Sequence, residues 1–388
     1  MTRPFGHHQF TIQRVPVVTM IESDKKAIAT TLENWLKPRL RAESVEIIEF
    51  KDRSGAGFSA ETFYIDVRYR REGKDQQDSL VVRFQNQDSD FFLEADIEFP
   101  YRVMEVMSER GGIPVPDLVG LEMDGKLLGA PFLVMRKMPG RVVQQSPNYN
   151  KEGWLRDLPP ERRGQVWFNA IDMMARVHRL DWRDGFEFLA DPKRGEPGLS
   201  NYLDWVEEWY LWSRGDKPIA LMDKAFERLK KDRPRNPPVD VLWGDPGSSN
   251  ILFGDDLQVN CVLDWEMATL GPAEVDLAWW LFFDQLFSEG MGVERLEGLP
   301  DRAQTIEYYQ SRLGRSVENM EYYDLLATFR MAIVGVRAVD RQIQLGRIPA
   351  DTGARSGQPI MAMLARRLGE PEPEVGEDFR VFSAAINL

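Results

Sequence analysis

Cysteine and histidine are scarce in this chain of 388 residues. Cys261 is its single cysteine, which excludes an intramolecular disulfide and a cysteine-rich zinc site. Two of the three histidines, His7 and His8, fall in an irregular lead-in, which leaves His178 alone for histidine chemistry. A multi-histidine metal site and a Ser-His-Asp triad are therefore disfavoured. The P-loop, nucleophile-elbow and dinucleotide-binding motifs are also absent, so carboxylate and metal chemistry remain.

Positive charge and long apolar runs are also in short supply. Lys and Arg number 49 against 62 Asp and Glu, which gives a formal net charge of -13. Because nucleic acids and anionic membranes are bound by basic patches, neither is an expected partner. No apolar run approaches membrane-spanning length, and residues 1–20 lack the charged-then-apolar layout of a signal peptide. With the single cysteine, this pattern favours a cytoplasmic protein.

The polar residues that suggest chemistry gather between residues 241 and 280. Two short β-type runs flank a Gly-Asp-Asp turn and predict a hairpin. Asp245 and Asn250 precede the first run and Asp264 follows the second, so the hairpin returns Asp264 to the other two. Such a set suits Mg²⁺ on a nucleoside triphosphate, with one carboxylate accepting the proton of an attacking hydroxyl. In isolation Asp245 and Asn250 would be read as turn formers, and Asp264 at this distance is what favours a site.

This stretch resembles the aminoglycoside phosphotransferase and choline kinase-like family, whose motif is His-Gly-Asp-x-x-x-x-Asn, then Ile/Leu-Asp-Trp-Glu, then Asp-Leu-Ala. The first part is matched here by Trp243-Gly-Asp245 and Asn250, and the second by Leu-Asp264-Trp-Glu266. The resemblance implies that Asp245 is the catalytic base and that Asn250 and Asp264 bind Mg²⁺. It also implies that the nucleotide is ATP or GTP.

Three further residues of the motif receive expectations. Asp276 opens the Asp-Leu-Ala part and is expected to be structural, either bonding the catalytic loop or capping its helix. Glu266 either supports the metal ligands or contacts the substrate or metal. Trp243 replaces the histidine of the family, and by analogy with kinases that histidine does not touch the transferred proton. Activity therefore need not be lost through this replacement.

The resemblance also covers the phosphate site of the N-terminal part. Gly57 and Ser59 lie in a small-residue loop between two strands, and such a loop can lay backbone N–H groups over phosphates. On its own this loop could equally be an ordinary hairpin turn. Arg83, on the following strand, takes the place of the kinase lysine that holds the α- and β-phosphates. Arginine keeps the charge and can bind phosphate bidentately.

A helix is expected over residues 91–109, with a kink at Pro100. In the family, a glutamate at the position of Pro100 pairs with the basic residue on the strand. Glu98 or Glu94 could replace that glutamate here, and a solvated helix face is the alternative for both.

The fold class implied by the resemblance is α+β, a protein-kinase-like fold of two lobes. A small antiparallel-sheet lobe with a helix and the phosphate loop is expected over residues 1–140. A large, mostly helical lobe is expected over residues 141–388, with the catalytic hairpin at 241–265 and the substrate-binding helices. Adenine would bond to the backbone between Arg136 and Met138, and a small-molecule hydroxyl acceptor would bind in the cleft between the lobes.

Several interpretations stay open at this point. Antibiotic-modifying members usually have Asp-x-Gly where this chain has Asp264-Trp-Glu266, which favours the broad metabolic branch acting on hydroxylated metabolites. An aminoglycoside O-phosphotransferase is one alternative, and a nucleotide-binding pseudokinase without transfer activity is another, motivated by Trp243 and Pro100. The acceptor and the oligomeric state are not indicated. Either core packing or an aromatic cage for a quaternary ammonium would explain three tryptophans on one helical face, namely Trp205, Trp209 and Trp212.

Overall fold

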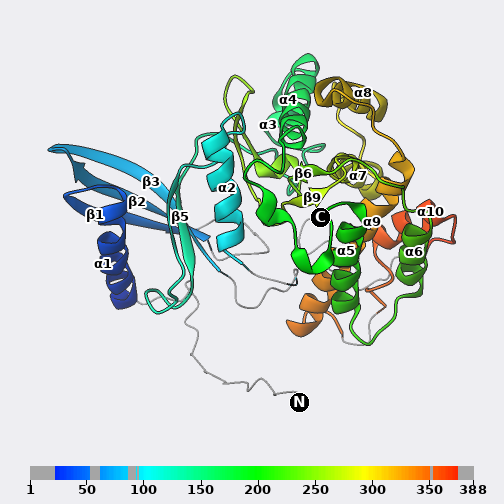
Figure 1. Ribbon diagram of the computed structural model, residues 1–388, viewed down its shortest axis with the longest axis horizontal. Helices are drawn as coiled ribbons and strands as arrows, with labels where there is room; N and C mark the ends of the chain where they lie inside the picture. The colour runs from blue at the N-terminus through cyan, green and yellow to red at the C-terminus, as the bar shows by residue number, and fades with distance from the viewer. Residues whose placement is uncertain (1–21, 53–61, 86–92, 94–95, 350–352, 375–388) are drawn as a thin grey trace. The chain divides into compact units, whose positions relative to one another are not determined.

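The computed structural model describes residues 22–52, 62–85, 93, 96–349 and 353–374 (Figure 1). The chain divides into two compact units, one formed by residues 1–85 and 119–135 and the other by residues 86–118 and 136–388. The division into lobes at residues 1–140 and 141–388 remains a prediction. Ser59 and Gly57 lie outside the described residues.

The first unit contains an antiparallel sheet of five strands in the order β1-β2-β3-β5-β4. Every second side chain over most of β2 is buried, and those between are partly buried or exposed, which is the pattern of a strand with one covered face. Phe63, Ile65 and Val67 of β2 are 5% exposed or less and face the core. The strands are β1 (Ser44–Asp52), β2 (Thr62–Arg71), β3 (Lys74–Phe84), β4 (Leu118–Glu122) and β5 (Phe132–Arg136).

Helix α1 (Glu22–Arg39) packs against this sheet (Figure 1). Leu32, Trp35 and Leu36 lie at helical spacing and are buried in one core with residues of the strands. The Trp35 indole N–H donates to Glu122 Oε2 at 2.8 Å, which satisfies its polar atom at the edge of the core. The first unit therefore has a hydrophobic core of its own.

Helix α2 (Glu98–Arg110) begins later than expected. The expected start at residue 91 and the expected kink at Pro100 are wrong, because Pro100 is the third residue of the helix. The first N–H groups of a helix have no partner within it, so proline is tolerated there. Glu98 is the acidic residue of the first turn, and Pro100 is buried.

The second unit is mostly helical. Its core gathers apolar residues of α5, α6, α7, α9 and α10, and α4 packs beside α8 (Figure 1). Its helices are α2, α3 (Trp154–Asp157), α4 (Pro160–His178), α5 (Leu199–Arg214), α6 (Ala220–Lys231), α7 (Glu274–Phe287), α8 (Arg302–Leu313), α9 (Met320–Gln344) and α10 (Pro359–Leu368). Single-turn 3₁₀ helices are η2 (Glu187–Leu189), η3 (Pro192–Arg194), η4 (Ser248–Asn250) and η5 (Glu289–Met291).

The three tryptophans of α5 pack into this core. Trp209 is fully buried, while Trp205 and Trp212 are partly buried against the same cluster. The guanidinium of Arg337, from α9, lies 4.1 Å from the centroid of the Trp212 ring. These contacts match the core-packing interpretation of the tryptophan face. Among the described residues, no helix combines the length and apolarity needed to span a bilayer.

The segment between α6 and α7 contains two short pairs of antiparallel strands. β7 (Ile251–Phe253) pairs with β8 (Val259–Val262) around the Gly-Asp-Asp turn, so the predicted hairpin is confirmed. β6 (Asp240–Leu242) pairs with β9 (Thr269–Gly271), a pairing not foreseen from the sequence. Because β6 precedes the hairpin and β9 follows it, this pairing joins the two ends of the segment that contains the hairpin.

Candidate active site

The loop that leaves β6 needs a glycine at its second residue. Gly244 has a φ of +87°. A Cβ built there would lie 1.9 Å from the carbonyl oxygen of Met267, which no side chain can accommodate. Gly244 thus allows the chain to turn sharply between the buried Trp243 and Asp245.

Asp276, in the first turn of α7, accepts hydrogen bonds from the backbone of this loop. It is fully buried, and its Oδ2 accepts the Trp243 N–H at 2.7 Å, while its Oδ1 accepts the Gly244 N–H at 3.2 Å. His178 Nε2 contributes a third bond to Asp276 Oδ2 at 3.0 Å. These three bonds satisfy the buried carboxylate, and the two from the backbone anchor the loop to Asp276.

His178 completes a buried chain behind Asp276. Its Nδ1 lies 2.5 Å from the hydroxyl of Tyr309, and both residues are buried. Burial raises the pKa of Tyr309 well above its ordinary value, so the hydroxyl keeps its proton and donates to Nδ1. The histidine proton then sits on Nε2, where it is donated to Asp276. His178 therefore packs and bonds, and no reacting group is needed to explain it.

Both carboxylate oxygens of Asp245 are held. Oδ1 accepts the Trp279 indole N–H at 2.7 Å, and Oδ2 accepts Asn250 Nδ2 at 3.1 Å. Burial, and next the charge of Asp264, raise the pKa of Asp245 to about 6. The two hydrogen bonds and the charge of Arg330 act in the opposite direction. The carboxyl group of Asp245 is thus oriented, and its pKa is closer to neutral pH than that of an exposed aspartate. A general base needs both properties.

Asp264 lies at the end of the hairpin and has a φ of 62°. The hairpin is tied to the loop by the Leu263 N–H, which donates to Asn250 O at 2.8 Å. The Trp243 indole N–H donates to Leu263 O at 2.9 Å. Leu263 precedes Asp264 in the chain, so its bond to Asn250 places Asp264 beside the pair that Asn250 forms with Asp245. The charge of Asp264 raises the pKa of Asp245. The structure therefore brings together Asp245, Asn250 and Asp264.

The donor set fits a hard divalent cation. Two mutually repelling carboxylates and an amide oxygen are the ligands that Mg²⁺ accepts, and a cation would relieve the repulsion. Across the described ranges, no group of three or more His, Cys, Asp or Glu side chains is placed to hold a metal ion. Mg²⁺ usually takes one or two carboxylates from a protein and completes its shell with water and substrate phosphates. Asn250 Oδ1 and Asp264 would supply the protein ligands.

The remaining predicted residues are spread along the chain. Arg83 lies on β3 of the first unit, and Glu98 begins α2 in the second. Arg136 ends β5, where its N–H donates to Asp117 O at 2.8 Å, and Met138 follows it. Glu266 follows Trp265 in the turn between β8 and β9 and is partly buried.

Trp279 and Arg330 are residues of this site that no motif in the sequence indicates. Trp279 stands three positions after Asp276, so both project from the same side of α7 toward the loop. That spacing was a usable signal. Arg330 sits in α9 within an otherwise apolar stretch, and a charged residue in such a stretch marks a buried polar contact.

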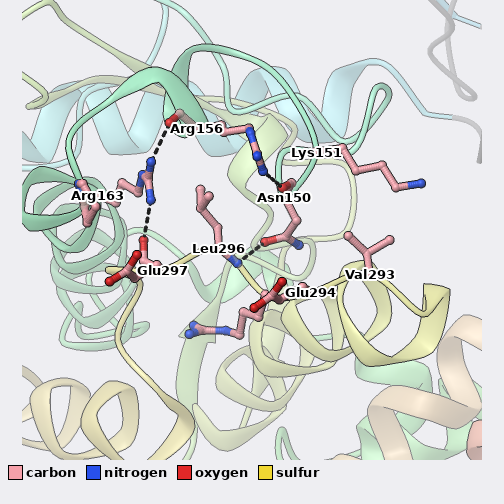
Figure 2. Close-up of a pocket in the computed structure, with 10 residues that line it drawn as sticks. Asn150, Lys151, Arg156, Arg163, Val293, Glu294, Leu296 and Glu297 are labelled. Atoms are coloured by element: carbon pink, nitrogen blue, oxygen red, sulfur yellow. Dashed lines mark hydrogen bonds between the residues drawn. The ribbon is translucent and has the colours of Figure 1, made fainter.

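One pocket of the second unit lies apart from this site. It has a volume of about 580 Å³ and is lined by residues 150, 151, 156, 160, 163 and 293–297 (Figure 2). Arg163 spans it by donating to the carbonyl oxygens of Arg156 at 2.6 Å and Glu297 at 2.7 Å. Its arginines thus close the pocket wall through backbone bonds, and the lining contains no residue of the loop around Asp245.

The chain has a protein-kinase-like fold, in which a five-stranded antiparallel sheet is followed along the chain by a mostly helical unit that bears the Asp-Asn-Asp arrangement. A sequence model of the phosphotransferase enzyme family (APH) matches residues 56–308. The chain belongs to this family, which confirms the family expected from the motif.

Similar proteins of known sequence are longer. Mouse (Mus musculus) acyl-CoA dehydrogenase family member 10 is 25% identical over 370 residues, covering 90% of this chain and 31% of that protein. Chicken (Gallus gallus) acyl-CoA dehydrogenase family member 11 is 26% identical over 255 residues, covering 61% of this chain and 30% of that protein. The chain spans about a third of the length of these relatives.

Similar solved structures agree on the fold. A Ralstonia eutropha protein described as a candidate aminoglycoside phosphotransferase matches with a TM-score of 0.63 and 21% identity, over 88% of this chain and 98% of that one. A macrolide 2'-phosphotransferase type I matches with a TM-score of 0.55 and 14% identity, over 91% and 99%. The predicted α+β, kinase-like fold class is confirmed.

Proposed function

We propose that this chain is an ATP- and Mg²⁺-dependent kinase that phosphorylates a hydroxyl group of a small molecule. The observation that carries the proposal is the convergence of Asp245, Asn250 and Asp264 around one loop, with Asp245 held by both oxygens. Family membership supports the phosphotransferase class. ATP or GTP is the donor in this proposal, and a cytoplasmic location is part of it.

Asp245 acts on the acceptor. Its pKa of about 6 leaves it ionised at neutral pH while keeping it a stronger base than an exposed aspartate. Trp279 and Asn250 fix the direction of its lone pairs, so an acceptor hydroxyl that bonds to Asp245 is oriented for attack. Asp245 accepts the hydroxyl proton as the new bond to phosphorus forms.

Asn250 and Asp264 hold the nucleotide end of the reaction. Asn250 donates its Nδ2–H groups to Asp245, so its Oδ1 can bind a cation. Asp264 provides a carboxylate for the same cation. Mg²⁺ bound to them would neutralise charge on the phosphates. Glu266 would support this set, and Asp276 keeps the loop in place through its backbone bonds.

The N-terminal residues complete the nucleotide site in this proposal. Arg83 would neutralise the α- and β-phosphates under the loop of Gly57 and Ser59, with Glu98 or Glu94 as its carboxylate partner. The backbone between residues 136 and 138 would bind the adenine. The acceptor would enter the cleft between the lobes.

Trp243 supports an active enzyme over a pseudokinase. It is fully buried, and its indole N–H bonds to Leu263 O, so it links the Asp245 loop to the residue before Asp264. Trp243, at the position of the family histidine, therefore connects the Asp245 loop to the end of the hairpin. The replacement therefore leaves the three reacting side chains supported.

The decisive experiment compares Asp245→Asn with a matched carboxylate. Asp255→Asn changes an exposed residue in the turn at the opposite end of the hairpin. Slow Mg²⁺-dependent ATP hydrolysis should fall at least about 100-fold in Asp245→Asn and stay unchanged in Asp255→Asn. Nucleotide binding should persist in both variants, and EDTA should abolish turnover by the wild type. A wild type that binds nucleotide without any hydrolysis would establish the pseudokinase instead.

A library of hydroxylated metabolites, screened by ATP consumption, would identify the acceptor. Hydroxylated acyl-CoA thioesters belong in this library because of the names of the longer relatives. A panel of aminoglycosides tests the antibiotic alternative. Turnover of aminoglycosides together with resistance in a host would replace the metabolic assignment.

A further inference from the structure

Arg330 is a buried arginine beneath the candidate catalytic loop. It projects from α9 and is 1% exposed. Its Nη2 donates to the carbonyl oxygen of Gly244 at 2.8 Å. Its guanidinium carbon lies 4.2 Å from the centroid of the Trp279 ring. Arg330 thus contacts two residues that each lead directly to Asp245.

Packing alone does not explain an arginine at this place. Within the described part of the chain, its Nε and Nη1 are buried and have no hydrogen-bond partner. Burying a charged group with unsatisfied donors is unfavourable, and an apolar side chain of similar size would be tolerated more easily. A residue that is unfavourable for stability and contacts a reactive loop is typical of a functional position.

The two contacts reach Asp245 by separate routes. Gly244 precedes Asp245 in the chain, so the bond to its carbonyl fixes the backbone from which Asp245 projects. Trp279 donates its indole N–H to Asp245 Oδ1 at 2.7 Å. A cation over the indole face polarises the ring and makes that N–H a better donor.

We propose that Arg330 is a positioning residue that holds Asp245 in its productive orientation through Gly244 and Trp279. The inference rests on the proposed kinase function and assigns a role to a residue outside the family motif. Arg330 does not touch the nucleotide or the metal ligands in this assignment. Its removal should therefore affect kcat more than KM.

Arg330→Met is the first test, with Mg²⁺-ATP and water as the assayed substrates. The variant should hydrolyse ATP with a kcat lowered about 10- to 100-fold, because misplacing a reacting group by about 1 Å has effects of that size. KM for ATP should change less than about threefold. Arg330→Lys keeps a charge over Trp279 and should recover at least about fivefold of the lost kcat. Equal kcat in the wild type and Arg330→Met would overturn the proposal, and so would a lysine variant no better than methionine.

Arg337→Met is the matched control. Arg337 lies on the same helix, two turns further along, and also stacks on a tryptophan, Trp212, away from Asp245. This variant should retain the wild-type kcat and KM. A loss of kcat equal to that of Arg330→Met would mean a general effect of α9 and would overturn the positioning role.

Trp279→Phe tests the route through the indole. Phenylalanine keeps an aromatic face for Arg330 and removes the N–H that reaches Asp245. Its kcat should fall about 10-fold, and the Arg330→Met/Trp279→Phe double variant should be much less impaired than the product of the two single effects. Effects that multiply fully would show that Trp279 is not a route from Arg330.

Hydrogen exchange separates this inference from the kinase proposal. Backbone amides of residues 243–250 should exchange at least about fivefold faster in Arg330→Met than in the wild type and Arg337→Met. If the wild type never hydrolyses ATP but the loop loosens, the kinase proposal fails and positioning stands. If the wild type is active and both kcat and loop exchange are unchanged in Arg330→Met, the positioning role alone fails.

Discussion

Replacing Asp245 by asparagine should stabilise the protein at pH 8 while it removes the proposed phosphoryl transfer. Burial and the charge of Asp264 raise the pKa of Asp245 from 3.8 to about 6. A rise of about 2 in the pKa, at about 1.4 kcal/mol for each unit, corresponds to about 3 kcal/mol of folding free energy lost when Asp245 ionises. Asparagine has nearly the same shape, and its oxygen can still accept the Trp279 N–H. Its NH₂ group requires Asn250 to turn its amide, so we expect a net gain of about 1–3 kcal/mol.

The pH dependence distinguishes this cause from a packing effect. A carboxyl group with a raised pKa in the folded state contributes stability that is full below about pH 4 and is lost as the pH rises through about 6. About half of the penalty is already present at pH 5. The advantage of Asp245→Asn should therefore grow by about 1–2 kcal/mol between pH 5 and pH 8.

Urea unfolding in EDTA at several pH values measures this difference. Asp255→Asn, in the exposed turn of the hairpin, is the control and should show no growing advantage. An Asp245→Asn variant whose stability relative to the wild type stays constant from pH 5 to pH 8 would refute the reasoning. Such a result would mean that Asp245 is not an electrostatically disfavoured carboxylate in the folded protein.

Three other residues give direct tests. Gly244→Ala should lower the free energy of unfolding by about 2–4 kcal/mol in urea titrations, since a Cβ would collide with Met267 O. If Gly244→Ala lowers this free energy less than a Gly→Ala substitution at an exposed glycine does, the result would contradict the geometry. Burial raises the pKa of the Cys261 thiol to about 12, so a thiol reagent at pH 8 should react only after urea is added, and rapid native labelling would be the contrary result. His178→Phe should cost about 2–4 kcal/mol by thermal or urea unfolding, because Asp276 would stay buried without its imidazole partner, and wild-type stability would show that the pair is dispensable.

The local parts of the candidate site were predictable. Asp245, Asn250 and Asp264 flank the two ends of one hairpin, and hairpin geometry follows from the Gly-Asp-Asp turn and the two apolar runs beside it. Asp276 was expected either to bond the loop or to cap its helix, and it accepts the N–H groups of Trp243 and Gly244. The start of α2 was not predicted, because Pro100 was read as a kink within a helix when it lies in the first turn.

The order of the chemistry-bearing residues and their spacing within a segment of about 40 residues follow from the sequence alone. The partners of Asp245 on other helices came only from the tertiary structure. Arg330 reaches Gly244 across 86 residues of chain, and Trp279 reaches Asp245 across 34. Periodicity predicts which face of a helix is buried, but the residue that this face meets depends on how α7 and α9 pack. That packing decides which donor orients the carboxylate and which cation lies behind it.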